Sequence, residues 1–105
     1  MTARVVVSNA AQPDARDVLD YLRAEAGDRI AVRYAHDFDA AVDRIAELPH
    51  SGSPRRQYGT DVRAVLVDPY LIFYETDFDG RHVRILRILH GSRDITVKLI
   101  LRGRE

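Results

Sequence analysis

The chain has 105 residues, of which 46% are hydrophobic and 30% are charged. This length supports one domain with one core, and the composition is that of a folded protein rather than a disordered one. Sixteen Lys and Arg residues balance sixteen Asp and Glu residues, and cysteine is absent, which excludes disulfides and thiolate chemistry. We therefore expect a single domain over residues 1–105 that works in the reducing cytoplasm.

Charge is distributed unevenly between the two halves of the chain. Residues 1–50 carry 6 Lys or Arg and 9 Asp or Glu, whereas residues 51–105 carry 10 and 7, so the halves have net charges of −3 and +3. Fifteen of the sixteen cations are arginine, which suits recognition of carboxylate or phosphate. This pattern is compatible with an acidic partner or a nucleic-acid-bound target, and a solvated surface explains it about as well.

The first half predicts a strand followed by two helices. Residues 3–8 form a β-branched run that we interpret as a buried strand, and their three valines are too short an apolar run for a signal peptide or membrane span. Pro13 and Asp14 suit a first helical turn, and apolar residues then recur at helical spacing until Gly27. A second helical pattern covers residues 28–49. The two helices should form an antiparallel hairpin.

The second half predicts a loop and an antiparallel meander. Residues 50–61 have loop composition, and apolar runs at 62–67, 70–76 and 82–89 are joined by short turns. With the N-terminal strand in the same sheet and the helices covering one face, the expected fold is α+β. Apolar and polar residues alternate in 95–105, which favours a half-buried strand over a helix or a tail.

Several motifs occur in one particular order: Pro49, the SGSPRRQYG loop, the Arg63 strand, PYLIFYE and RILRILHGSRD. Their order resembles that of the RelE/ParE family of bacterial toxins over nearly the whole chain. The HGSRD ending and the YLIFY strand resemble the ParE branch, whose characterised members inhibit DNA gyrase and lack a nuclease site. The resemblance implies the toxin of a type II toxin–antitoxin system, which stabilises a plasmid or chromosome.

The same resemblance implies a set of partners. A cognate antitoxin, ParD-like and with a DNA-binding ribbon-helix-helix region, is expected to neutralise the toxin. It would lay a helix or an extended segment over an apolar groove, with its acidic residues meeting arginines. The resemblance implies no cofactor, no metal, no membrane contact and no direct sequence-specific binding of nucleic acid.

The RelE branch is the main alternative, because its members cleave messenger RNA on the ribosome. Such cleavage needs cations to stabilise charge on the phosphate and a group that transfers a proton. The two Arg positions of that branch fall on Leu71 and Arg93 here, and its later Tyr or His falls near Leu99, with no Tyr, His or Trp after His90. Two of the three positions therefore lack the residue that the RelE branch uses, so we expect no efficient cleavage of RNA. If the chain is a ribonuclease, His90 and Arg93 are its catalytic residues; a module that binds antitoxin without toxicity is a third possibility.

Nine residues are candidates for contact with the target or the antitoxin: Arg55, Arg56, Arg63, Tyr70, Tyr74, Arg87, His90, Arg93 and Asp94. For each residue there is also an interpretation in which it serves the fold or is solvated and contacts no partner. The first three arginines, in the loop and the following strand, either dock an acidic antitoxin segment or steer the toxin to its target, or they are simply solvated. The two tyrosines belong to the core or line a groove. The remaining histidines, at positions 36, 50 and 82, have no metal-ligand spacing and are expected to be exposed.

The last four candidates lie in or next to the RILRILHGSRD motif. By alternation Arg87 shares a face with Val83, Ile85 and Leu89, so it is either a rim residue or a paired cation. For His90 we favour a structural role, in which it ends the strand by hydrogen bonding to Asp94 or to backbone. Arg93 and Asp94 either pair with each other or reach the partner.

Overall fold

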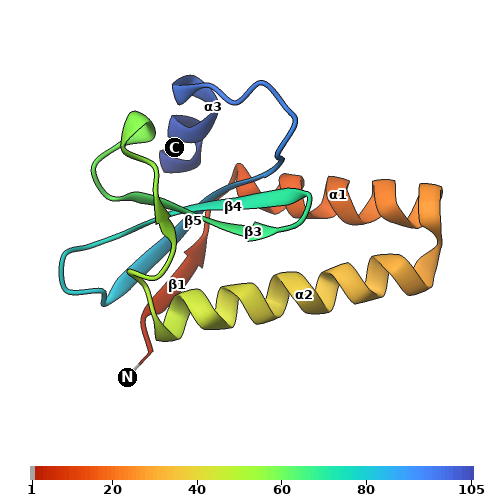
Figure 1. The fold of residues 1–105 in the computed structure, drawn as a ribbon, viewed down its shortest axis with the longest axis horizontal. Helices are drawn as coiled ribbons and strands as arrows, with labels where there is room; N and C mark the ends of the chain where they lie inside the picture. The colour runs from red at the N-terminus through yellow and green to blue at the C-terminus, as the bar shows by residue number, and fades with distance from the viewer. Residues whose placement is uncertain (1) are drawn as a thin grey trace.

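The computed structural model describes residues 2–105, whose strands form one sheet in the order β1-β5-β4-β3-β2 (Figure 1). Two long helices follow the first strand, and a short helix lies near the C-terminal end. This is the predicted α+β arrangement. The elements in chain order are β1 (Arg4–Val7), α1 (Ala11–Ala26), α2 (Asp28–Glu47), β2 (Ser53–Pro54), the 3-10 turn η1 (Arg56–Tyr58), β3 (Val62–Val67), β4 (Tyr70–Thr76), β5 (His82–His90), α3 (Val97–Leu101) and the 3-10 turn η2 (Arg102–Arg104).

The sheet combines the predicted meander with a parallel edge strand. Strands β3, β4 and β5 pair antiparallel in sequence order, and β1 lies parallel to β5 with Arg4 opposite His82. The interpretation of residues 3–8 as a buried strand is wrong, because Val6 is 49% exposed. As an edge strand, β1 has a neighbour on one side only. The α1–α2 hairpin also covers only one face of the sheet.

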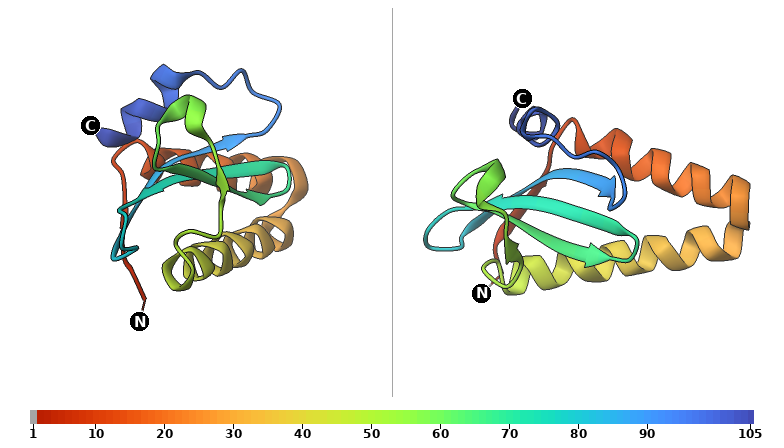
Figure 2. Two further views of the ribbon diagram at one scale, coloured as in Figure 1. Left: turned by 60° about the vertical axis from the view of Figure 1, so that its left-hand side comes forward. Right: turned by 45° about the horizontal axis from the view of Figure 1, so that its top comes forward.

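Each face of the sheet has its own apolar cluster. On the helix-hairpin face, Phe38 and Ile45 of α2 pack with Ile72 and Tyr74 of β4. On the other face Phe73 packs in a separate cluster that includes Ile100 of α3. Helices α2 and α3 accordingly lie on opposite sides of the sheet (Figures 1 and 2). The predicted alternation along β4 is confirmed.

An irregularity in β5 changes which residues face which cluster. Phe73 pairs with Arg87 while Tyr74 pairs with Ile85, so Leu86 has no partner across the strand pair. Such a bulge shifts the alternation by one residue. Ile85 therefore faces the helix hairpin, whereas Leu89 faces α3. Arg87 pairs with Phe73 and so shares the α3 face with Leu89, as predicted, but the prediction that it also shares a face with Val83 and Ile85 is wrong.

Residues 95–105 contain the helix α3 and the 3-10 turn η2, and not the predicted strand. The Thr96 hydroxyl caps α3 by accepting a hydrogen bond from the Leu99 amide at 3.2 Å, and Ile100 is completely buried. Gly103 lies so close to β5 that an added Cβ would be 2.5 Å from the Leu86 carbonyl oxygen. The helix forms here because the second sheet face carries apolar residues, such as Leu86, that need a cover.

The segment predicted as a plain loop, residues 50–61, contains the short strand β2 and the turn η1. Tyr74 attaches its start to the sheet: the phenol donates a hydrogen bond to the Pro49 carbonyl at 2.7 Å and accepts one from the Gly52 amide at 2.9 Å.

Earlier in the chain, Gly27 separates the two helices with a positive φ of 91°. Within residues 2–105, no helix combines the length and the apolar character needed to cross a membrane.

Candidate functional site

A groove of about 490 Å³ opens where the helix hairpin extends past the end of the sheet. Figures 1 and 2 show this overhang of α1 and α2. Helix α1 contributes Val18 and Tyr21, and Tyr34 comes from α2. Tyr21 is 61% exposed, so its large aromatic ring is available to a partner that enters the groove. The floor is formed by the start of β4 and the end of β5.

Three predicted site residues lie in this groove: Tyr70, His90 and Arg93. The rings of Tyr70 and His90 meet edge to face, with centroids 5.4 Å apart, and Tyr34 meets Tyr70 in the same way at 5.9 Å. Burial raises the pKa of the Tyr70 phenol above its ordinary value of 10.0, and the neighbouring phenols of Tyr34 and Tyr21 raise it further. Tyr70 is therefore a neutral, largely buried part of the groove wall.

The imidazole of His90 is held by the turn that follows β5. Its Nδ1 atom accepts a hydrogen bond from the Ser92 amide at 3.1 Å and lies 2.8 Å from the Ser92 hydroxyl. A structural role for His90 thus agrees with the geometry: of the two predicted partners, the backbone is found, through the Ser92 amide, and Asp94 is not. Because Nδ1 accepts from an amide, the neutral ring carries its proton on Nε2.

The two charged residues after this turn are exposed. The Arg93 amide donates to the His90 carbonyl at 3.0 Å, which places the residue at the mouth of the groove. Among residues 2–105, neither Arg93 nor Asp94 forms an ion pair. The arginine is free to meet an acidic group of a partner.

Arg87 lies beneath the groove and is a paired cation. Its guanidinium binds the Asp14 carboxylate with distances of 2.7 and 2.8 Å, and both side chains are about nine-tenths buried. The hydrogen bonds to Asp14 raise the pKa of Arg87 above its ordinary value. One of the two predicted alternatives for Arg87 is thereby confirmed. Tyr74 is also interior, so these two residues do not suit a surface that a partner contacts.

The loop arginines belong to a different part of the molecule. Arg63 on β3 donates a hydrogen bond to the Gly52 carbonyl at 2.8 Å, and Arg56 is exposed on η1. Arg55 donates to the Pro54 carbonyl at 3.4 Å. None of the three lines the groove, so the structure separates the predicted site residues into two surfaces.

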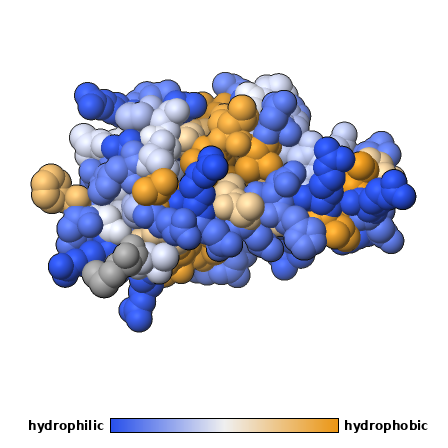
Figure 3. Space-filling view, turned by 60° about the horizontal axis from the view of Figure 1, so that its bottom comes forward, coloured by the Kyte–Doolittle hydropathy of each residue, from blue (hydrophilic) through white to orange (hydrophobic). Residues whose placement is uncertain are grey.

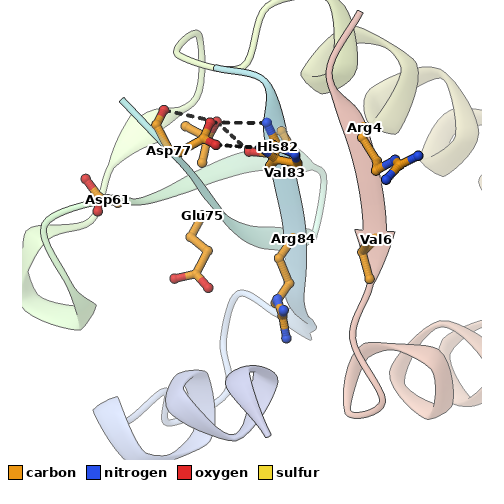
Figure 4. A pocket seen from close by; sticks show the side chains of 9 residues that line it. Arg4, Val6, Asp61, Glu75, Asp77, His82, Val83 and Arg84 are labelled. Atoms are coloured by element: carbon orange, nitrogen blue, oxygen red, sulfur yellow. Dashed lines mark hydrogen bonds and ion pairs between the residues drawn. The ribbon is translucent and has the colours of Figure 1, made fainter. Parts of the chain in front are cut away.

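A second cleft, of about 440 Å³, lies on the sheet face beside β1 (Figure 4). Arg4 and Arg84 extend from neighbouring strands, and Glu75 of β4 points toward the C-terminal helix. Arg104 binds Glu75 with a distance of 2.7 Å. Most of the residues that line this cleft are polar or charged, and both signs of charge are present. No motif in the sequence pointed to it.

Two other groove residues were missed as well. Asp14 was recognised only as a first-turn helix residue, and Tyr21 was not singled out. Asp14 is 73 positions from Arg87, so no local spacing connects them. Tyr21 falls close to the apolar positions of its helix, and the sequence gives no sign that the sheet ends before it.

Comparisons with known sequences point to one family. A family model described as the ParE toxin of the type II toxin–antitoxin system parDE matches residues 5–95. Toxin ParE1 of Caulobacter vibrioides is 29% identical over 93 residues, which cover 89% of this chain and 94% of that toxin.

Two solved structures share the fold. A chromosomal ParDE toxin–antitoxin system from P. aeruginosa matches with a TM-score of 0.70 and 19% identity, over 85% of this chain and 96% of that one. The toxin–antitoxin complex RelBE2 from Mycobacterium tuberculosis matches with a TM-score of 0.60 and 23% identity, over 86% and 99%.

The N-terminal strand, the helix hairpin and the five-stranded sheet define a class of small α+β folds, which both solved structures share. Within that class, the family match over residues 5–95 distinguishes the branch. The chain belongs to the ParE toxin family of type II toxin–antitoxin systems, as its motifs predicted.

Proposed function

We propose that this toxin inhibits DNA gyrase by binding it, without catalysing a reaction, and that a cognate antitoxin neutralises it in the cytoplasm. The observation that carries the proposal is the ParE family match over residues 5–95. The exposed Tyr21 and Arg93 support the antitoxin part of the proposal, because they offer an apolar and a charged contact to a protein partner. The test is DNA supercoiling by purified gyrase in the presence of the toxin.

The groove is the proposed docking site of the antitoxin. Val18, Tyr21 and Leu22 recur at helical spacing along α1 and supply the apolar wall that an amphipathic segment needs. An acidic residue of that segment would meet Arg93 at the mouth. Strand addition to the free edge of β1, beside Val6 and Val7, is the other route. The DNA-binding part of the antitoxin, ParD-like with a ribbon-helix-helix fold, would remain outside the groove.

A ribosome-dependent ribonuclease is the second candidate, because His90 and Arg93 line one groove. Two observations weigh against it. The first cation of that chemistry is replaced by Leu71, whose side chain packs in the apolar cluster under α3. His90 Nδ1 already accepts a hydrogen bond from Ser92. Loss of one charge-stabilising donor typically lowers the rate by about two to three orders of magnitude.

Two measurements separate the candidates. Induction of the toxin followed by mapping of messenger RNA ends would reveal breaks if the chain is a ribonuclease, and the proposal expects none. Growth arrest without the antitoxin distinguishes either toxin from a module that only binds antitoxin. The proposal expects arrest together with loss of supercoiling activity.

A further inference from the structure

The β4–β5 turn carries the most exposed large apolar side chain of the described residues. Phe78 is 99% exposed, compared with 61% for Tyr21 and Leu66, the next most exposed of these side chains. Figure 3 shows apolar atoms projecting at the end of the molecule where this turn lies. A fully exposed phenylalanine contributes nothing to the folded core, so packing within this chain does not explain it.

The turn that presents Phe78 is held in place by the preceding residue, Asp77. The Asp77 carboxylate accepts hydrogen bonds from the amides of Arg81 and His82 at 2.9 and 3.1 Å, and its second oxygen lies 2.7 Å from His82 Nδ1 (Figure 4). Its carbonyl accepts from the Gly80 amide at 3.0 Å. These four contacts to one residue fix the backbone on both sides of Phe78.

A neighbouring segment supports the turn from behind. Gly80 has a positive φ of 69°, and the His50 ring lies 3.2 Å from the position of an added Cβ. The Pro49 ring is nearly as close, at 3.6 Å. Because the turn is held by its own hydrogen bonds and by residues 49–50, binding would order little additional chain, which lowers the entropic cost of association.

The surroundings of Phe78 are polar. A cleft of about 290 Å³ lies beside the ring and is lined by His50, Thr60, Asp61, Arg63, Thr76 and Asp77. Asp61 is exposed and forms no ion pair with any residue in 2–105. A rigid aromatic side chain with a polar rim is the arrangement found at the centres of protein–protein interfaces.

This surface lies at the opposite end of the sheet from the groove. The groove is at Tyr70 and His90, where β4 begins and β5 ends, whereas the turn joins the end of β4 to the start of β5. The seven residues of β4 separate the two surfaces by roughly 20 Å. An antitoxin segment in the groove therefore leaves Phe78 uncovered.

We propose that Phe78 is the anchor by which this toxin binds its target protein, with the ring entering an apolar pocket of the target and Asp61 meeting a basic side chain at its rim. This inference rests on the proposed function and adds the contact residue. The antitoxin would then neutralise the toxin by steric hindrance. Bound in the groove, it would keep a large target protein away without contacting Phe78 itself.

The test compares the wild-type chain with Phe78→Ala, Phe78→Tyr and Leu66→Ala. The last is a matched control, because Leu66 is a large exposed apolar residue on β3. Phe78→Ala should raise the toxin concentration for half-inhibition of gyrase at least about tenfold and relieve growth arrest on expression. Phe78→Tyr, which keeps the ring, and Leu66→Ala should stay within about twofold of wild type. Tm and antitoxin affinity should not change.

Three results would overturn the inference while leaving the proposed function intact. They are full inhibition and arrest by Phe78→Ala, a parallel loss of antitoxin affinity, and binding of wild type to phosphatidylglycerol vesicles that Phe78→Ala abolishes. If the wild type arrests growth without affecting gyrase, gyrase is not the target. The growth assay then tests the inference by itself, and growth arrest by Phe78→Ala would overturn it. If the wild type does neither, both are overturned.

Discussion

The Asp14 carboxylate and the Arg87 guanidinium form two parallel hydrogen bonds, with Nε–Oδ2 and Nη2–Oδ1 distances of 2.7 and 2.8 Å. The same carboxylate accepts a hydrogen bond from the Ile88 amide at 3.0 Å. From its other side, Arg87 donates to the Leu99 carbonyl at 3.0 Å. This pair therefore joins α1, β5 and α3 beneath the groove, and it keeps the groove wall in place.

Asp14→Ala should lower the free energy of unfolding by about 3 kcal/mol, because it removes the counter-charge of a nearly buried guanidinium and leaves the Nε and Nη2 groups of Arg87 and the Ile88 amide without an acceptor. Urea unfolding followed by circular dichroism measures the change. Asp17→Ala removes an exposed carboxylate from the same helix and is the control, which should stay within about 0.5 kcal/mol of wild type. Equal losses in both variants would contradict a special role for the pair.

The packing of α3 on the sheet predicts a second pair of variants. Ile100→Ala should destabilise the protein by about 2–4 kcal/mol, because Ile100 is fully buried against the second apolar cluster. Leu101→Ala removes the neighbouring, exposed side chain and should cost less than about 1 kcal/mol. Thermal unfolding of both variants measures the difference. If residues 95–105 formed a strand or a loose tail instead, this contrast would disappear.

The stability that the β4–β5 turn gives to the folded protein should depend on pH. Hydrogen bonds from the His82 side chain and backbone lower the pKa of Asp77 from 3.8 to about 2. A lowered pKa means that the ionised carboxylate stabilises the folded state fully above about pH 4, and that this contribution is lost as the pH falls toward 2. Asp77→Asn should therefore lower Tm at pH 7 and have little effect near pH 2.

Asp79→Asn is the control for that series. Asp79 lies in the same turn, but it accepts one backbone hydrogen bond, from Arg81 at 3.2 Å, and its 3.4 Å ion pair with the Arg81 side chain is solvent-exposed. Its Tm should follow that of the wild type at both pH values. A gap between wild type and Asp77→Asn that persisted unchanged at pH 2 would show that the charge of Asp77 is not the cause.

The groove predicts which variants weaken antitoxin binding. Tyr21→Ala removes an exposed aromatic contact, and Arg93→Glu reverses the charge at the groove mouth. Each should raise the Kd for the cognate antitoxin about 10- to 100-fold, as loss of a central interface contact does. Isothermal titration calorimetry measures the affinity. Arg56→Glu, on the separate loop surface, tests the specificity: an equally large loss there would place the antitoxin on the loop and not in the groove.

Much of the fold was predictable because local patterns determine it. Helical spacing up to Gly27, the Asp77–Gly80 turn and the alternating runs of the meander all depend on residues close in sequence. The two main errors have a common physical origin. Whether residues 3–8 are buried and whether 95–105 form a strand depend on how many faces of the sheet are covered, which is a property of the whole molecule.

The candidate site was predictable only in part. The HGSRD motif drew attention to His90 and Arg93, and both lie in the groove. The partner of Arg87 could not be found, because Asp14 is 73 positions away and helices carry many acidic residues. Tyr74 was offered as a contact residue because alternation cannot distinguish a groove from a core. Phe78 was passed over because a turn residue leaves no periodic signal.

The most direct measurement is inhibition of purified DNA gyrase by the purified toxin, titrated with and without its antitoxin. We expect supercoiling of relaxed plasmid to fall with increasing toxin and to be restored at one equivalent of antitoxin, while messenger RNA in a parallel translation reaction stays intact. Normal supercoiling at a large excess of folded toxin would contradict the account, and it would do so decisively if the messenger RNA were cleaved.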